Sequence, residues 1–188
     1  MKEITSLTIK LFLFCTVVAA LLATVNGITQ PIIAENEAKN FQLSMQEVLS
    51  DASSFEKMDI AISPAEGGVT VSSVHRADTG GFVVSSVCSE GYGGDVTIMV
   101  GINPDLTVKQ VRIMSMSETP GLGAKASSSQ FTDQYRGLKN GIEVIKNATP
   151  SGNQIQALSG ATVTSRAVTK AVNAALLAAE QAQGGIVE

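Results

Sequence analysis

Residues 96–116 read VTIMVGINPDLTVKQVRIMSM and carry the strongest fold signal in the chain. From Val96 to Ile102 every second residue is Val or Ile, which is the period of two expected of a β-strand. Asn103-Pro104-Asp105 is typical of a turn, and β-type residues resume from Val108 to Met116. The stretch therefore predicts an antiparallel β-hairpin.

Further elements are expected on both sides of this hairpin. Residues 81–87 and 141–145 predict two more strands, whereas the polar residues 50–68 predict mostly loop. Thr164 to Gln183 is Ala-rich with one apolar side and predicts a helix. Residues 34–49 have apolar side chains at helical spacing and predict an amphipathic helix. Strands in a run with helices at both ends predict an α+β fold with a mainly antiparallel sheet flanked by helices.

One shorter element follows the hairpin. Ser127-Ser128-Ser129 offers hydroxyl groups that commonly cap the start of a helix. Phe131 and Tyr135 come directly after these serines and lie one helical turn apart. We therefore expect a helix that begins near these serines.

The N-terminal segment differs in composition from the rest of the chain. No residue from Leu11 to Ile33 is charged. A helix over this run would extend about 34 Å, at about 1.5 Å per residue, which is enough to cross the apolar core of a bilayer. We therefore expect residues 1–33 to be a transmembrane anchor and residues 34–188 to form one extracytoplasmic domain.

The charges that flank the apolar run bear on its orientation. Lys2 and Lys10 precede the run and Glu35 follows it, which favours a cytoplasmic N-terminus in a cell inner or plasma membrane. A cleaved signal peptide is the alternative, because the start is basic and Val25-Asn26-Gly27 is a tolerable cleavage site. Of the two, we expect the uncleaved, single-pass anchor.

Composition excludes several classes of function. The net charge is −4 and Lys and Arg are not clustered, which argues against a nucleic-acid surface. Cys15 and Cys88 are the two cysteines and His75 is the single histidine. These are too few for a protein-only metal site or an iron–sulfur cluster. If the chain carries electrons, the carrier is therefore organic.

The first candidate motif is LSGATVTS, residues 158–165, where a loop turns into the C-terminal helix. Free N–H groups and the helix dipole make such a position suitable for an anion. Ordinary N-capping is the alternative. Capping needs a single hydroxyl, however, and this stretch supplies those of Ser159, Thr162, Thr164 and Ser165.

The second candidate motif is SETPGLGAK, residues 117–125. Pro followed by two glycines predicts a tight loop whose backbone can approach a flat ligand. Glu118 could accept a hydrogen bond from a ring N–H or a sugar hydroxyl, and Leu122 could cover an aromatic face. Taken alone, the loop is better explained as a surface turn with a solvated Glu118. Gly91-Tyr92-Gly93-Gly94 is a third, weaker feature; it is no nucleotide fingerprint because no helix follows.

Together these motifs resemble the FMN-binding domain family that is shared by the G subunit of the Rnf complex and the C subunit of the Na⁺-translocating NADH:quinone reductase. Residues 158–165 resemble the family's flavinylation motif, in which the phosphate of FMN is esterified to a threonine, here Thr162. Residues 117–123 are similar to the loop that lies against the flavin, and Tyr92-Gly93-Gly94 is similar to the Gly-rich entry to the first hairpin strand. One position departs from the pattern: the family usually has Asp where this chain has Gln156.

The resemblance implies a covalent FMN on Thr162, which would be an attachment point and not a catalytic nucleophile. No catalytic and no metal-binding residue is expected. The other residues that the resemblance places at the cofactor are Ser159, Gly160, Ala161, Thr164, Ser165, Glu118, Thr119, Gly121, Leu122, Gly123, Lys125 and Tyr92.

The function implied by the resemblance is electron relay within a redox-driven ion pump, a ferredoxin:NAD oxidoreductase of the Rnf type. Its partners would be the other subunits, a flavin transferase for maturation and the lipid bilayer. Two alternatives stay open. The chain could be a free-standing anchored FMN domain that serves another acceptor, or a cofactor-free binding or scaffold domain.

Overall fold

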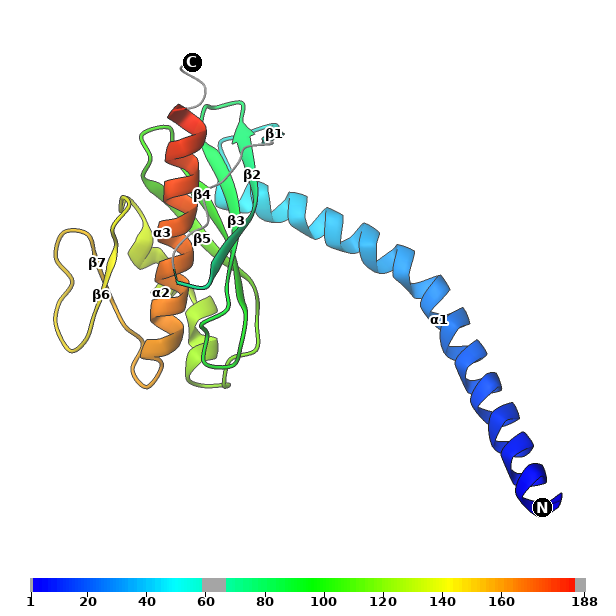
Figure 1. Ribbon diagram of the computed structural model, residues 1–188. Helices are drawn as coiled ribbons and strands as arrows, with labels where there is room; N and C mark the ends of the chain where they lie inside the picture. The colour runs from blue at the N-terminus through cyan, green and yellow to red at the C-terminus, as the bar shows by residue number, and fades with distance from the viewer. Residues whose placement is uncertain (1, 59–66, 185–188) are drawn as a thin grey trace. The chain divides into compact units, whose positions relative to one another are not determined.

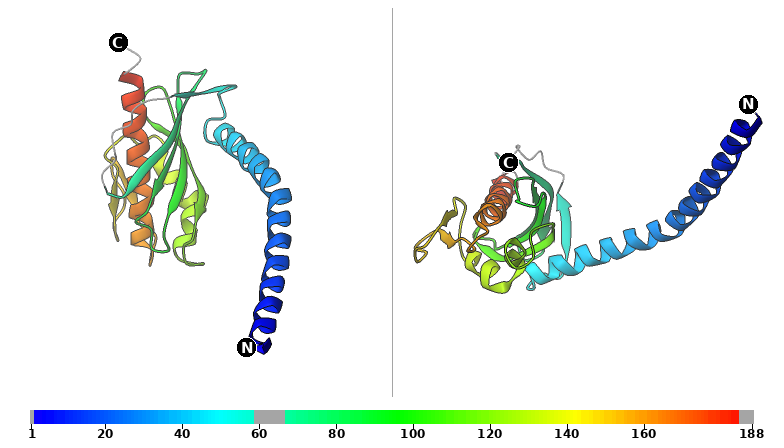
Figure 2. Two further views of the ribbon diagram at one scale, coloured as in Figure 1. Left: turned by 45° about the vertical axis from the view of Figure 1, so that its right-hand side comes forward. Right: turned by 90° about the horizontal axis from the view of Figure 1, so that it is seen from below.

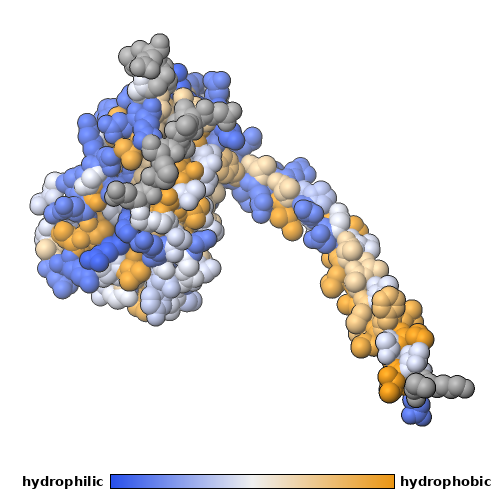
Figure 3. All heavy atoms as spheres, viewed as in Figure 1, coloured by the Kyte–Doolittle hydropathy of each residue, from blue (hydrophilic) through white to orange (hydrophobic). Residues whose placement is uncertain are grey.

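A single long helix forms the N-terminal part of the computed structural model, which describes residues 2–58 and 67–184. This helix, α1 (Lys2–Val48), continues without a break through Pro31 (Figure 1). It is long and apolar enough to cross a membrane, and its large apolar side chains from Ile4 to Ile33 are exposed (Figure 3). The hydroxyls of Thr16 and Thr24 donate to the carbonyls four residues earlier, which satisfies them within an apolar segment.

The chain divides into two units, Met1–Leu43 and Ser44–Glu188. The last turn of α1 therefore belongs to the second unit. The predicted division into an anchor of residues 1–33 and a domain of residues 34–188 stays a prediction.

The second unit is built on a five-stranded antiparallel sheet in which neighbours in sequence are neighbours in space. The predicted hairpin is confirmed, because β4 (Val96–Ile102) pairs with β5 (Val108–Met116). The strand predicted at residues 81–87 is β3 (Phe82–Cys88). Two strands of this sheet were not predicted: β1 (Phe55–Met58), inside the expected loop, and β2 (Val69–Ala77).

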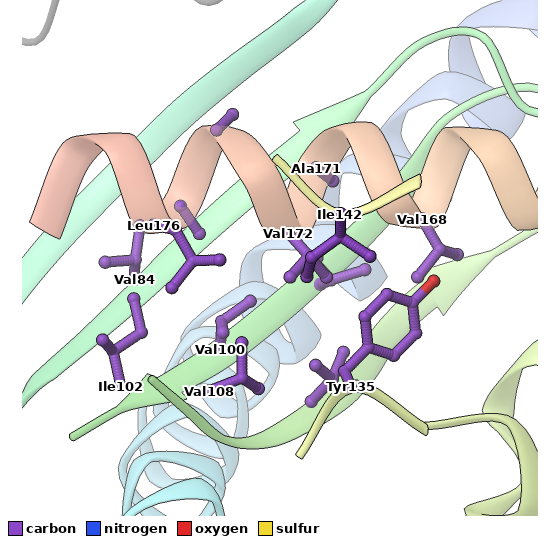
Figure 4. Packing of buried hydrophobic residues seen from close by; sticks show 14 of the residues in the cluster. Val84, Val100, Ile102, Val108, Tyr135, Ile142, Val168, Ala171, Val172 and Leu176 are labelled. Atoms are coloured by element: carbon purple, nitrogen blue, oxygen red, sulfur yellow. The ribbon is translucent and has the colours of Figure 1, made fainter. Parts of the chain in front are cut away.

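The C-terminal helix α3 (Thr162–Gly184) covers one face of this sheet (Figure 2). Val168, Val172 and Leu176 point from α3 toward the strands, where they meet Val84 and Val100 (Figure 4). These side chains are almost entirely buried. Burying an apolar side chain of this size contributes about 1.5–3 kcal/mol, so the contact between α3 and the sheet is a main source of stability.

The other face is covered by the end of α1 and the residues that follow it. Met45, Val48 and Leu49 are buried there. Gly101 permits this approach, because a Cβ at Gly101 would overlap the main-chain carbonyl of Val48. The sheet thus has helical segments on both faces, which confirms the α+β fold with a mainly antiparallel sheet.

Short elements connect the hairpin to α3. They are η1 (Gly123–Ser127), α2 (Ser129–Thr132) and η2 (Asp133–Tyr135), followed by β6 (Glu143–Ile145) and β7 (Gln154–Gln156), which pair in parallel. The helical segment near Phe131 and Tyr135 was predicted, and both rings are buried. The expected capping is wrong for Ser128, whose hydroxyl donates to the Lys125 carbonyl and makes no cap bond.

Candidate functional site

A pocket of about 500 Å³ lies at the N-terminal end of α3. It brings together both candidate motifs and the Gly-rich loop, which are far apart in the sequence. Its lining residues are Tyr92, Glu118, Thr119, Leu122, Gly123, Gly160, Ala161, Thr162, Val163 and Thr164.

A tight turn positions the start of α3 at the pocket. The Ala161 N–H donates to the Leu158 carbonyl at 3.0 Å, and Gly160 has a φ of +74°, which favours glycine. The first helical hydrogen bond runs from the Ser165 N–H to the Ala161 carbonyl. Thr162 is therefore the first residue of α3, and the N–H groups of this first turn have no acceptor within the helix.

The four hydroxyls of the first motif have different surroundings. Thr162 is half-buried and lines the pocket. Thr164 is buried and donates to Glu118, whereas Ser159 is exposed. Ser165 is fully buried; its Oγ accepts from the Leu158 N–H at 3.0 Å and donates to the Ala161 carbonyl at 2.9 Å. Ser165 therefore shapes the turn from inside, whereas Thr162 lines the pocket.

Glu118 connects the loops around the pocket. Only 8% of its surface is exposed, so the solvated Glu118 of the surface-turn alternative is wrong. Its Oε1 accepts from the N–H groups of Tyr92 at 2.9 Å and Gly93 at 3.4 Å. Its Oε2 accepts from the Thr164 hydroxyl at 2.9 Å. The carboxylate thus joins the Gly-rich loop to the first turn of α3.

The glycines of the motifs are needed for this arrangement. A Cβ at Gly123 would lie 2.5 Å from Glu118 Oε2 and 2.7 Å from the Thr164 hydroxyl. A Cβ at Gly91 would lie 2.9 Å from Glu118 Oε1. Any side chain at either position would displace the carboxylate or its partners.

The rim of the pocket is apolar. Tyr92, Leu122 and Val163 are 76%, 47% and 51% exposed, and all three line the pocket. Val163 was not predicted; its place between two hydroxyl residues in the first turn of α3 was the available signal. An apolar rim beside a helix N-terminus suits a ligand with a flat ring at one end and an anion at the other.

Comparisons with known proteins find family matches in both the N-terminal helix and the domain that follows it. A family model described as the FMN-binding domain matches residues 91–177, and one described as the RnfG N-terminal region matches residues 1–48. The G subunit of the proton-translocating ferredoxin:NAD⁺ oxidoreductase complex of Clostridium ljungdahlii is 33% identical over 93% of this chain and 91% of its own. The chain belongs to the RnfG family.

A second RnfG relative and one solved structure are also similar to this chain. The G subunit of the Na⁺-translocating ferredoxin:NAD⁺ oxidoreductase complex of Acetobacterium woodii is 34% identical over 92% of this chain and 89% of its own. The crystal structure of NqrC from Shewanella oneidensis aligns with a TM-score of 0.49 at 25% identity, covering 54% of this chain and 53% of that one. The FMN-binding match spans all three segments that line the pocket of this RnfG chain.

Some of the predicted site residues of this RnfG chain do not line the pocket. They are Ser159, Gly121, Lys125 and Ser165. Lys125 is exposed on η1. Gln156, the position that departs from the family pattern, has an exposed side chain at the end of β7. Its main chain is held by Gln134, whose Oε1 accepts from the Gln156 N–H at 2.8 Å.

Proposed function

We propose that this chain carries one FMN, esterified through its phosphate to Thr162, and relays electrons as the G subunit of an ion-translocating ferredoxin:NAD⁺ oxidoreductase. The observation that carries the proposal is the position of Thr162. It is the first residue of α3 and lines a pocket whose other walls come from the two remaining motifs.

The pocket fits the chemistry of FMN. Its volume of about 500 Å³ lies within the range of about 300–1,000 Å³ that is usual for small-molecule sites. The N-terminus of α3 provides N–H groups and positive dipole charge for a phosphate. Gly123 and Gly160 let the backbone approach a flat ring closely, and the exposed side chains of Tyr92 and Leu122 are placed to cover it.

Each part of the site would then have a distinct task. The Thr162 Oγ would hold the phosphorus atom in an ester, and a flavin transferase would form that bond during maturation. Because the tether keeps the ring beside its own pocket, the effective concentration of FMN stays high even where free flavin is scarce. Bound FMN supplies the capacity to accept and release electrons, and the surrounding residues set its potential and orientation.

The relatives and the helix α1 support a place for this chain in a membrane-bound complex. The C. ljungdahlii and A. woodii relatives are named as subunits of ion-translocating ferredoxin:NAD⁺ oxidoreductase complexes. We infer that this chain likewise works with other subunits of such a complex. The apolar part of α1 would anchor it in the bilayer, with Lys10 on the cytoplasmic side and the FMN domain outside.

The test is the intact mass of the full-length chain purified from its native membrane, with peptide mapping of residues 158–165. An added mass of FMN minus water on Thr162, in a preparation that contains several other membrane subunits, supports the proposal. Flavin attached to a chain that is isolated alone as an active reductase would favour the free-standing alternative. A colourless, unmodified chain produced together with its flavin transferase would refute the proposal that the chain carries FMN. That result would favour the cofactor-free scaffold domain.

A further inference from the structure

We propose that Glu118 is a positioning residue whose buried negative charge lowers the reduction potential of the FMN, in addition to holding the walls of its pocket together. The inference rests on the proposed function, because it concerns the flavin that Thr162 would carry. It assigns Glu118 a role that differs from hydrogen bonding to the ligand.

The hydrogen bonds of the carboxylate favour its charged form. Glu118 accepts from three donors, namely the main-chain N–H groups of Tyr92 and Gly93 and the hydroxyl of Thr164. Two of these donors are main-chain N–H groups that point at one carboxylate oxygen, and hydrogen bonds of this kind stabilise the charged form. Hydrogen bonds to a charged acceptor are also stronger than neutral ones. Glu118 therefore ties the Gly-rich loop to α3 with bonds that depend on its charge.

Glu118 takes part in no ion pair within the described ranges 2–58 and 67–184, where the ion pairs join other residues. Lys170, on the same helix as Thr164, is paired with Glu90. Hydrogen bonds stabilise a buried carboxylate, but they leave its net charge in place.

The carboxylate is also held in one place beside the ligand space. It lines the pocket and is only 8% exposed, so water screens it poorly. Gly123 and Gly91 pack against its two oxygens so closely that neither position has room for a Cβ. Because the side chain is confined from both sides and tied at both oxygens, its distance from a bound ring would be nearly constant.

A fixed negative charge acts on the redox equilibrium of whatever binds beside it. An electron that arrives on the flavin adds one negative charge, unless a proton arrives with it. Repulsion between this charge and Glu118 disfavours the reduced form. The side chain therefore makes the flavin a stronger reductant, which suits a carrier that must pass its electrons on.

Glu118→Gln removes the negative charge and keeps hydrogen bonds to the pocket walls, so it tests the effect of the charge alone. The amide has nearly the same size; its oxygen can accept from the Tyr92 N–H, and its NH₂ group can donate to the Thr164 hydroxyl. The full-length chain is matured with its flavin transferase, FMN attachment is verified by in-gel fluorescence, and the potential is measured by spectroelectrochemical titration. We expect Glu118→Gln to favour the reduced form by about tenfold, which is about 59 mV for a one-electron couple.

A matched variant controls this measurement. Asp95→Asn removes the same charge from an exposed carboxylate close to the Gly-rich loop, where water screens it. This variant is not expected to raise the potential.

The positioning role has a readout that needs no flavin. Tyr92 is exposed, so chymotrypsin can cleave after it whenever the loop opens. In the protein before flavin attachment, Glu118→Ala should speed this cleavage at least severalfold, whereas Glu118→Gln should not. Glu118→Ala also removes the charge, so the reduction potential of its FMN should rise as well. This variant takes the place of Glu118→Gln in the titration if the Gln variant does not retain FMN.

The outcomes are distinct. If the Gln and Ala variants carry FMN at the wild-type potential, Glu118 does not tune the flavin. Unchanged cleavage after Tyr92 in Glu118→Ala would overturn the positioning role. A wild-type chain that carries no FMN after maturation would instead refute the proposed function, and the cleavage measurement would still stand.

Discussion

The Oε2 atom of Glu118 lies 2.9 Å from the hydroxyl of Thr164, and the two residues are 46 positions apart in the sequence. This hydrogen bond joins the loop of residues 117–125 to the first turn of α3. Each segment alone has an ordinary explanation, as a surface turn and as a capped helix start. The contact makes them two walls of one pocket that contains Thr162.

Thr162→Ala should abolish covalent flavin without unfolding the domain. Thr162 is half-buried, and among the hydrogen bonds of the described residues none uses its hydroxyl. Its removal should therefore change the free energy of unfolding by less than about 0.5 kcal/mol. In-gel flavin fluorescence and thermal unfolding test this, with Ser159→Ala as the control that keeps its flavin. Fluorescence retained in Thr162→Ala would rule out the assigned attachment site.

Ser165→Ala should destabilise the attachment turn from inside. The buried hydroxyl of Ser165 accepts from the Leu158 N–H and donates to the Ala161 carbonyl. Its loss leaves the Leu158 N–H without this acceptor, whereas the Ala161 carbonyl keeps the Ser165 N–H as a donor. We expect a cost of about 1–3 kcal/mol. Urea unfolding of the variant measures this cost, and Ser159→Ala, at an exposed position, should be neutral. An equal stability of the two variants would contradict the structural role of Ser165.

Gly101→Ala should weaken the contact between the sheet and the end of α1. The added methyl group would overlap the Val48 carbonyl, so strand β4 or the helix end would have to move. Overpacking of this kind typically costs about 1–3 kcal/mol. Thermal unfolding checks this against Gly184→Ala, where a new Cβ meets nothing within 4 Å. A Gly101→Ala variant as stable as wild type would show that the two segments separate easily.

Gln156→Asp should affect maturation and leave stability unchanged. The Gln156 side chain is exposed, and only its main chain is held by Gln134. An acid at this position can therefore act only through an external partner such as the flavin transferase. We expect faster flavin attachment in a time course by mass spectrometry. The control is Ser151→Asp, an exposed site in the loop before β7; equal rates in both variants and wild type would show that the departure is harmless.

His75 should make the domain less stable as the pH falls from about 7 to 5. Burial lowers the pKa of His75, and the nearby charge of Lys57 lowers it further. Because the folded pKa lies below the ordinary value of about 6.5, the unfolded chain binds the proton more readily. Stability is thus present above pH 6.5 and is lost as the pH drops through and below that value. Urea unfolding at several pH values should show a smaller change in His75→Gln than in wild type.

The sequence by itself determined the elements whose signals are local. The alternation in β4 and β5, the turn between them and the apolar face of α3 all lie within short windows, so their bounds were predicted closely. Strand β2 was missed because it contains Ser72, His75 and Arg76 and only three of its nine residues are buried. Strand β6 was predicted within residues 141–145, whereas the three-residue strand β7 is too short for a periodic signal. Asn173 of α3 holds the segment before β6 through Ile142.

The motifs were also visible in the sequence, and with them the residues that line the pocket except Val163. Only the tertiary structure decided what those residues do. It buried Glu118 and gave it partners from two distant segments. It turned Ser165 inward and left Thr162 on the pocket wall. Burial and hydrogen-bond partners depend on which distant segments meet, and no local pattern of residues contains that information.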